Sequence, residues 1–285
     1  MKKFKLYWSN YFNGKKLNEN AAVSLKTKDG EIIQIDTGCP FTFINYDYAL
    51  VNNMIDASYI KNSKDFSINE LGHKFFYLKN HNINIENYSF TIEKCYLELD
   101  KTKDIKKKKN TYWINELNKQ NIGYLGLDFF YNSIVEFDFH KSTLKFIDEK
   151  FTNLMPIKIT SNSSYCIFNL ELDNKSYKVM FDTGSSSSGF IINNKFKKYF
   201  DKLILHKEEI IRNDFVSNIE YGFLNSKIIF DNGYKINDNI KIEFPDNKFN
   251  SYLFNNDKFD AILGLQFLRN YKCTFDFKNN NLYIE

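Results

Sequence analysis

Proline, glycine and cysteine are scarce in this sequence. Its 285 residues include 3 prolines, 11 glycines and 4 cysteines. With so few prolines and glycines, many turns must be made by Asn and Asp, which tolerate the left-handed backbone conformation. The cysteines are scattered, with no Cys-x-x-Cys pair, so we expect reduced, mostly buried thiols and neither a metal site nor a dense disulfide framework.

A strong charge of one sign and a long apolar run are also missing. The 39 basic and 35 acidic residues give a net charge of +4, which does not indicate nucleic acid or an anionic membrane as a partner. The lysine-rich stretch 101–109 reads as a solvated loop, the alternative being a surface that attracts an acidic partner. No run reaches the roughly 18 apolar residues of a membrane helix. Since the N-terminus also lacks a secretory signal, we expect a cytoplasmic protein unless a leader has been removed.

Aromatic residues are abundant instead. The 29 Phe, 19 Tyr and 2 Trp make up 18% of the chain, which is too rich for disorder and favours strands. The length allows one large domain or two of about 140 residues. Composition therefore predicts a globular, mostly β protein with a sizeable core.

Two stretches share one pattern, an apolar strand that ends in Asp-Thr-Gly and is followed by a second apolar run. They are IIQIDTGCPFTFI, at 32–44, and VMFDTGSSSSGFII, at 179–192. Burying a lone carboxylate is unfavourable by several kcal/mol unless the group is paired or hydrogen-bonded. Asp36 and Asp182 are therefore expected to lie together and to stabilise each other.

A second repeat shows that the whole chain is duplicated. The segment GYLGLDFFYNSIVEFDFHKSTLKF, at 123–146, aligns without a gap on AILGLQFLRNYKCTFDFKNNNLYI, at 261–284. The two acids are 146 residues apart but these segments only 138, so we place an insertion in the first half at 100–120. The predicted domains are 1–152 and 153–285.

Each half is expected to begin with a hairpin that delivers its acid. The hairpins are predicted at 21–35 and 165–181 because strand-like runs there flank Asp- and Asn-containing turns. Short helical segments are predicted to follow at 46–59 and 194–206.

The paired motifs resemble those of the aspartic proteases. Each Asp-Thr-Gly is followed 82 to 90 residues later by Leu-Gly-Leu and then by Phe-Asp-Phe, and the resemblance covers 21–284. It implies an all-β fold with a few short helices, the bilobal acid-protease fold, built from two pseudo-symmetric β-barrel-like lobes. The two-lobed arrangement is similar to pepsin, whereas the compact lobes look more like two retroviral-type (retropepsin-like) proteases fused in one chain.

The resemblance also implies an activity and its residues. Asp36 and Asp182 would activate a water that hydrolyses a peptide bond of an extended polypeptide substrate, without a cofactor or a metal. With both acids in one chain, we expect a monomer. The residues expected to support the dyad are Thr37, Gly38, Cys39, Thr183, Gly184 and Ser185. Those expected to pack beside it are Leu125, Gly126, Leu263 and Gly264.

A closing flap is implied in the family and is assigned here by spacing alone. Strand-like runs surround a glycine in each half and would form hairpins that project from the body. The flap candidates are Gly72, His73 and Tyr77 in the first half and Tyr221 and Gly222 in the second.

The sequence departs from the family at the residue after Asp-Thr-Gly, which is Cys39 in one half and Ser185 in the other. A hydroxyl that donates to a carboxylate favours its charged form. We therefore hypothesise that Asp182, beside Ser185, is the more readily ionised acid and that Asp36 carries the shared proton. The loss of one hydroxyl also predicts a pH optimum less acidic than that of a dyad with two.

Alternative interpretations stay open beside this one. The chain could be a catalytically silent peptide-binding or scaffolding module of the same fold, or, with less support, an adhesin-like or regulatory surface protein. The acids of the Phe-Asp-Phe repeats, Asp138 and Asp276, are interpreted as turn caps rather than catalytic groups. The serine run 185–188 is interpreted as a loop that packs beside Asp182.

Overall fold

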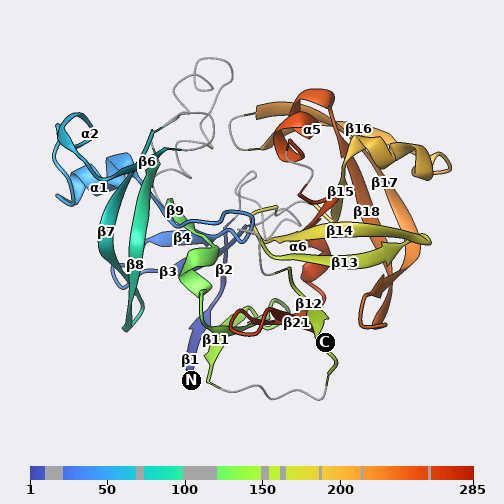
Figure 1. Cartoon of the computed structure of the whole chain (residues 1–285), viewed down its shortest axis with the longest axis horizontal. Coiled ribbons are helices and arrows are strands. Elements are labelled where there is room, and N and C mark those ends of the chain that lie inside the picture. The colour runs from blue at the N-terminus through green and yellow to red at the C-terminus, as the bar shows by residue number, and fades with distance from the viewer. Residues whose placement is uncertain are drawn as a thin grey trace.

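The computed structural model describes residues 1–9, 22–68, 74–98, 121–148, 154–160, 165–185, 188–212, 215–255 and 258–285. Strands make up 54% and helices 14%, which confirms the prediction of a mostly β chain with a few short helices. The strands form three sheets, one from each half of the chain and one shared between the halves (Figure 1).

The C-terminal half forms a closed barrel of six strands. Their order is β13-β14-β19-β15-β18-β17, and β17 returns to pair with β13. A seventh strand, β16, adds to β17. Closure removes the exposed edges that an open sheet leaves. The bounds are β13 Ile167–Leu172, β14 Lys175–Asp182, β15 Phe190–Ile192, β16 His206–Arg212, β17 Phe215–Phe230, β18 Lys235–Pro245 and β19 Ala261–Gly264.

The N-terminal half forms an open sheet of eight strands in the order β2-β3-β4-β9-β5-β8-β7-β6. Within the described residues, β3 and β7 are joined by a single isolated bridge, Thr27 to Ile85. Two barrel-like lobes were expected, but only the C-terminal half forms a closed barrel, and the N-terminal sheet is open. The bounds are β2 Tyr7–Ser9, β3 Ala22–Lys26, β4 Ile32–Ile35, β5 Phe43–Asn45, β6 Phe66–Ile68, β7 Lys74–Ile85, β8 Tyr88–Glu98 and β9 Asn121–Leu125.

The two sheets repeat the same pairings around their acids. The strand that leads into each Asp-Thr-Gly, β4 or β14, pairs in parallel with the strand of the Leu-Gly-Leu repeat, β9 or β19. That strand pairs antiparallel with β5 or β15, which in turn runs parallel to β8 or β18. The duplication seen in the sequence is therefore also a duplication of strand topology.

The third sheet joins the halves through the order β1-β11-β10-β20-β21-β12. Its central strands carry the two Phe-Asp-Phe repeats and pair antiparallel, with Val135 opposite Phe275. In Figure 1 this sheet lies below both lobes. The bounds are β1 Lys2–Lys5, β10 Ile134–Asp138, β11 Thr143–Ile147, β12 Ile157–Lys158, β20 Lys272–Asp276 and β21 Asn281–Ile284.

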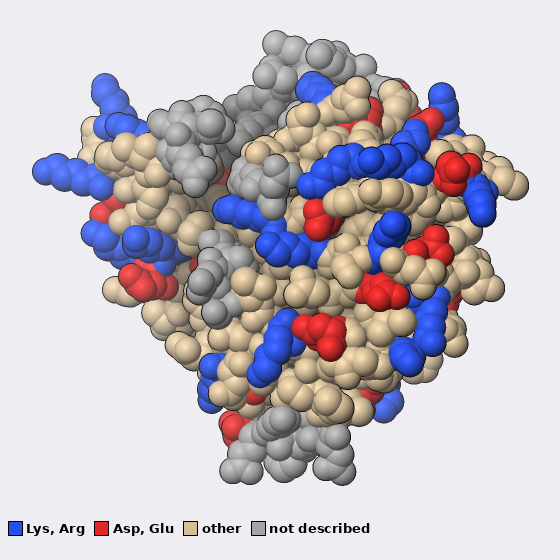
Figure 2. Space-filling model, turned by 45° about the vertical axis from the view of Figure 1, so that its right-hand side comes forward, with Lys and Arg blue, Asp and Glu red and all other residues tan. Residues whose placement is uncertain are grey.

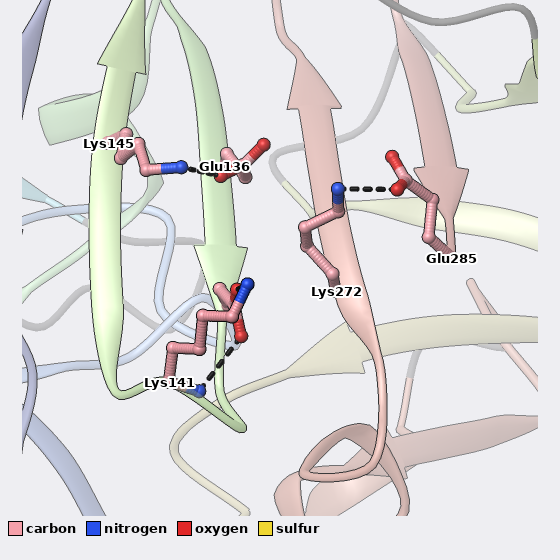
Figure 3. A network of polar contacts seen from close by, with 6 residues as sticks. Glu136, Lys141, Lys145, Lys272 and Glu285 are labelled. Atoms are coloured by element: carbon pink, nitrogen blue, oxygen red, sulfur yellow. Dashed lines mark hydrogen bonds and ion pairs between the residues drawn. The ribbon is translucent and has the colours of Figure 1, made fainter.

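Ion pairs decorate the shared sheet (Figure 3). Lys145 contacts Glu136 across β11 and β10, and Lys272 contacts Glu285 beside β21. Ion pairs that water can reach stabilise a fold by about 1 kcal/mol at most. The apolar face of this sheet must therefore supply most of its stability.

One continuous apolar core connects the shared sheet to the strand that carries the second acid. The ring centroids of Phe181, at the end of β14, and Phe275 are 4.4 Å apart, and those of Phe275 and Phe137 are 5.8 Å apart. All three side chains are almost completely buried. Since burying a Phe side chain stabilises by about 2–3 kcal/mol, this contact ties the site to the joint between the halves.

Helices are short, and the predicted ones are shorter than expected. The segment predicted at 46–59 contains α1 Tyr46–Val51, and α2 Tyr59–Asn62 begins at its end; Asn53 between them is in the left-handed conformation with φ 54°. The segment predicted at 194–206 is a 3₁₀ helix, η2 Asn194–Phe200. The others are η1 Leu127–Phe130, α5 Asn247–Leu253 and α6 Leu265–Leu268.

Several smaller predictions are confirmed. Asp138 accepts a hydrogen bond from the backbone N–H of Lys141 at 2.9 Å, and Asp276 accepts one from Asn279 at 3.0 Å, so both acids cap turns. All four cysteines are free thiols and three of them are buried. The predicted domain boundary falls at 149–153, outside the described residues, and stays a prediction.

Candidate active site

Each candidate acid sits where a buried strand reaches the middle of the molecule. Asp182 is the last residue of β14 and pairs with Gly264 of β19. Asp36 directly follows β4, and its backbone N–H donates to the carbonyl of Leu125 at 3.0 Å. The apolar strands before both acids fix the position from which the carboxyl groups project.

The threonines of the two motifs lock the halves together. The N–H of Thr37 donates to the hydroxyl of Thr183 at 3.1 Å, and the N–H of Thr183 donates to the hydroxyl of Thr37 at 2.9 Å. Each hydroxyl then donates to a carbonyl of the opposite half, at Phe181 and at Ile35. Both threonines are buried, so four interdomain hydrogen bonds hold the two motifs face to face.

The two carboxyl groups share one site. The single N–H of Gly38 lies 3.0 Å from Oδ1 of Asp36 and 3.1 Å from Oδ1 of Asp182. The N–H of Gly184 donates to Oδ1 of Asp182 at 2.7 Å. The acids, 146 residues apart in the sequence, therefore meet around the same backbone donors.

The glycines of both motifs leave room for the opposite acid. A Cβ on Gly38 would lie 2.5 Å from Cγ of Asp182, and a Cβ on Gly184 would lie 2.5 Å from Cγ of Asp36. No side chain tolerates such a distance without displacing the carboxylate. The requirement for glycine here is close approach, not an unusual backbone conformation.

The surroundings of the two acids are unequal. Burial, the charge of Asp182 and the hydrogen bond between the two carboxyl groups raise the pKa of Asp36 well above its usual range. Burial also raises the pKa of Asp182, but hydrogen bonds from Gly184, from Asp36 and from the N–H groups of Ser185 and Gly38 oppose this rise. Both pKa values are raised, so the pair holds one proton between its two carboxyl groups, and the surroundings favour charge on Asp182.

The direction of this asymmetry matches the hypothesis from the sequence, but its cause differs. Within the described residues the hydroxyl of Ser185 donates no hydrogen bond to Asp182; its backbone N–H does so. The thiol of Cys39 donates to the carbonyl of Phe41 at 3.1 Å, and burial raises the pKa of that thiol. Each acid accepts from the N–H groups of its own glycine and of the next residue, and the donor without a counterpart is the N–H of Gly38, which also reaches Asp182.

The Leu-Gly-Leu residues pack beside the motifs. A Cβ on Gly126 would lie 2.3 Å from the carbonyl carbon of Phe41, and one on Gly264 would lie 2.4 Å from the carbonyl oxygen of Ser188. Leu125 and Leu263 are completely buried. These four residues occupy the packing positions that the sequence predicts.

Only one of the first three flap candidates can be placed. Gly72 and His73 fall outside the described residues, so their assignment stays a prediction. Tyr77 lies on β7, where its ring is 5.6 Å from that of Tyr96 and is mostly buried.

The second pair of flap candidates is not at a hairpin tip. Tyr221 and Gly222 lie in the middle of β17, where Tyr221 pairs with His206 of β16 and Glu243 of β18. A Cβ on Gly222 would lie 2.4 Å from the side chain of Leu203. The missing side chain leaves room for the segment at Leu203. The expectation that Gly222 marks a hairpin turn is therefore wrong, and a flap role for the two residues stays a prediction.

Sequence reasoning missed two acids that hold the loops after the motifs, the partly buried Asp128 and the buried Glu243. The hydroxyl of Thr42 donates to Oδ1 of Asp128 at 2.6 Å, and that of Ser188 donates to Oε2 of Glu243 at 2.7 Å. Glu243 is completely buried and contacts Lys241 at 2.8 Å. Glu243 falls on the polar phase of the alternation in β18, together with Lys241, so no sequence pattern indicated that it would be buried.

We also searched the described part of the chain for a metal site, a surface of one charge and a membrane-spanning helix. No group of three or more His, Cys, Asp or Glu side chains there is placed to hold a metal ion. On the face in Figure 2, Lys and Arg side chains are interspersed with Asp and Glu. Among the ion pairs of the described residues, Lys195 pairs with Asp260 at 3.3 Å. None of the helices described has the length and apolar character needed to cross a membrane.

Comparison with models of protein families gave no match, and comparison with curated proteins gave none either. The site is therefore interpreted from its own geometry. Its deciding feature is a pair of interacting carboxyl groups, held in place by the hydrogen bonds between Thr37 and Thr183.

Proposed function

We propose that this chain is an aspartic endopeptidase with the bilobal acid-protease fold, in which Asp36 and Asp182 activate one water molecule. The observation that carries the proposal is the N–H of Gly38 shared by both Oδ1 atoms. Two acids around one donor hold a single proton, which is the arrangement needed for combined acid and base catalysis.

The unequal surroundings give each acid a role. Asp182, charged, takes a proton from water as the water oxygen bonds to the peptide carbonyl carbon, and Asp36 donates its proton to the carbonyl oxygen. The tetrahedral intermediate then loses the amine, which leaves with the proton from Asp182, while Asp36 recovers its own. One water is consumed and the dyad ends with the proton it began with.

Single substitutions test the proposal. Asp36→Asn and Asp182→Asn should each abolish cleavage of a denatured protein substrate, because each removes one of the two proton-transfer groups. Thr91→Ala, on the exposed side of β8, serves as a control that should cleave normally. Retained cleavage in either Asn variant, or binding of peptides by the wild type without cleavage, would refute it; the second result would indicate a silent peptide-binding module.

A further inference from the structure

The loop after Asp36 is fastened to the segment after β9. The N–H of Leu127 donates to the carbonyl of Cys39 at 2.9 Å, and the N–H of Asp128 donates to that of Pro40 at 3.3 Å. Gly126 lets the two backbones touch at Phe41. The loop 39–42 is therefore held from one side by this segment.

A hydrogen bond between the buried Thr42 and the partly buried Asp128 also holds the loop. Thr42 is fully buried, its hydroxyl donates to Asp128, and the same oxygen accepts the N–H of Gly126 at 3.1 Å. A hydrogen bond as short as 2.6 Å to a carboxylate is charge-assisted and stronger than a neutral one. Burial raises the pKa of Asp128, and within the described residues no Lys or Arg pairs with it, so its charged form depends on Thr42 and on backbone donors.

In the C-terminal half, the loop after Asp182 is held by a different acid. There Ser188 of the loop binds Glu243, which comes from β18 and is neutralised by Lys241. The register shows that Glu243 occupies the place of Tyr96 in the other half, since both lie opposite matching residues of β15 and β5. In both halves a hydroxyl of the loop after Asp-Thr-Gly donates to a carboxylate, although the two acids come from different elements. We infer that this loop must be held in place in both halves.

The fastened loop acts directly on the dyad. The backbone N–H of Cys39 is one of the donors that lower the pKa of Asp36. The ionisable groups facing Asp128 are the thiols of Cys39 and Cys95 and the phenol of Tyr131, whose pKa values its charge raises. A shift of the loop would therefore change how the proton is held between the acids.

Building on the proposed function, we propose that Asp128 is a positioning residue that, through Thr42, keeps the loop 39–42 and its N–H donor in place beside Asp36. Asp128→Leu and Thr42→Val should each lower kcat about tenfold with KM within about twofold, and the double variant should be no worse than the poorer single one, because the two residues act as one unit. Asp128→Asn and Thr42→Ser keep an acceptor and a hydroxyl and should restore most of the activity.

A titration separates this proposal from the proposed function. The carboxyl carbons of Asp36 and Asp182, followed by NMR, should titrate at higher pH in Thr42→Val than in the wild type, because Asp36 loses a donor. Asp276→Leu, which removes a buried turn cap away from the dyad, should leave both titrations unchanged. Unchanged titrations in Thr42→Val, or additive losses in the double variant, would overturn the positioning role. A shifted titration in a protein that cleaves nothing would support it and refute the peptidase proposal instead.

Discussion

Asp36 is the residue in which burial and function conflict most directly. Its folded-state pKa is raised, so its neutral form is favoured by the fold and its charged form is penalised. The resulting stability is fully present below the ordinary pKa of an aspartate and is lost as the pH rises through the raised value. The Asn side chain of Asp36→Asn is neutral at every pH, so this variant does not lose stability from ionisation at position 36.

We therefore predict that Asp36→Asn gains stability relative to the wild type as the pH rises. Each unit by which the pKa is raised corresponds to about 1.4 kcal/mol. Urea unfolding at pH 4 and at pH 7 measures the difference. A stability gap between the two proteins that is the same at both pH values would contradict the raised pKa.

The residue after Asp-Thr-Gly leads to a second prediction at this scale. Because the backbone of Ser185, not its hydroxyl, contacts Asp182, Ser185→Ala should leave the acidic limb of the pH–rate profile within about 0.3 unit of the wild type, a shift worth only about 0.4 kcal/mol. That limb belongs to the pair of acids rather than to one of them. A larger shift on removing the hydroxyl would reinstate the cause inferred from the sequence.

At the scale of elements, the two lobes differ in how their sheets close. The barrel of the C-terminal half is sealed by three residue pairs between β13 and β17, whereas the N-terminal sheet has the bridge at Thr27. Local opening is easiest where few contacts must break. The weaker seam should therefore open first.

Hydrogen exchange tests this expectation. Amides at Lys28 and Glu86, which bond across the N-terminal seam at 3.0 and 3.3 Å, should exchange faster than those in Leu170–Leu172 at the barrel seam. The comparison uses the same protein at the same pH, so intrinsic rates can be corrected directly. Equal protection of both seams would show that the open sheet is as stable as the barrel.

The elements also show what the sequence could predict. The two Asp-Thr-Gly motifs and the Leu-Gly-Leu repeats predict the strands that surround the acids, because repeated motifs are recognised from local residues. Gly222 misled because a glycine inside a strand indicates either a turn or a close approach, and only the path of the segment at Leu203 decides between them. The bond between Ser188 and Glu243 depends on the register of β15 against β18, which no local pattern specifies.

For the whole molecule, the threonine lock is the feature that makes one site from two halves. Thr37→Val removes a donor and an acceptor and leaves the carbonyl of Phe181 and the N–H of Thr183 buried without partners. Each such group costs about 1–3 kcal/mol. We predict that the variant loses about 2–4 kcal/mol of unfolding free energy by urea titration, while Thr37→Ser, which keeps the hydroxyl, loses about 1 kcal/mol or less. A larger loss in Thr37→Ser than in Thr37→Val would mean that packing of the methyl group, not the lock, stabilises the joint.

The pairing of β10 with β20 in the shared sheet has a consequence for synthesis on the ribosome. Strand β20 is the second-to-last strand of the chain, and Phe275 within it supports Phe181 next to the second acid. A nascent chain that has emerged only as far as Asp182 has both acids but not the strand that completes their support. The two acids are therefore expected to be held in their final positions only after β20 has also emerged and paired with β10.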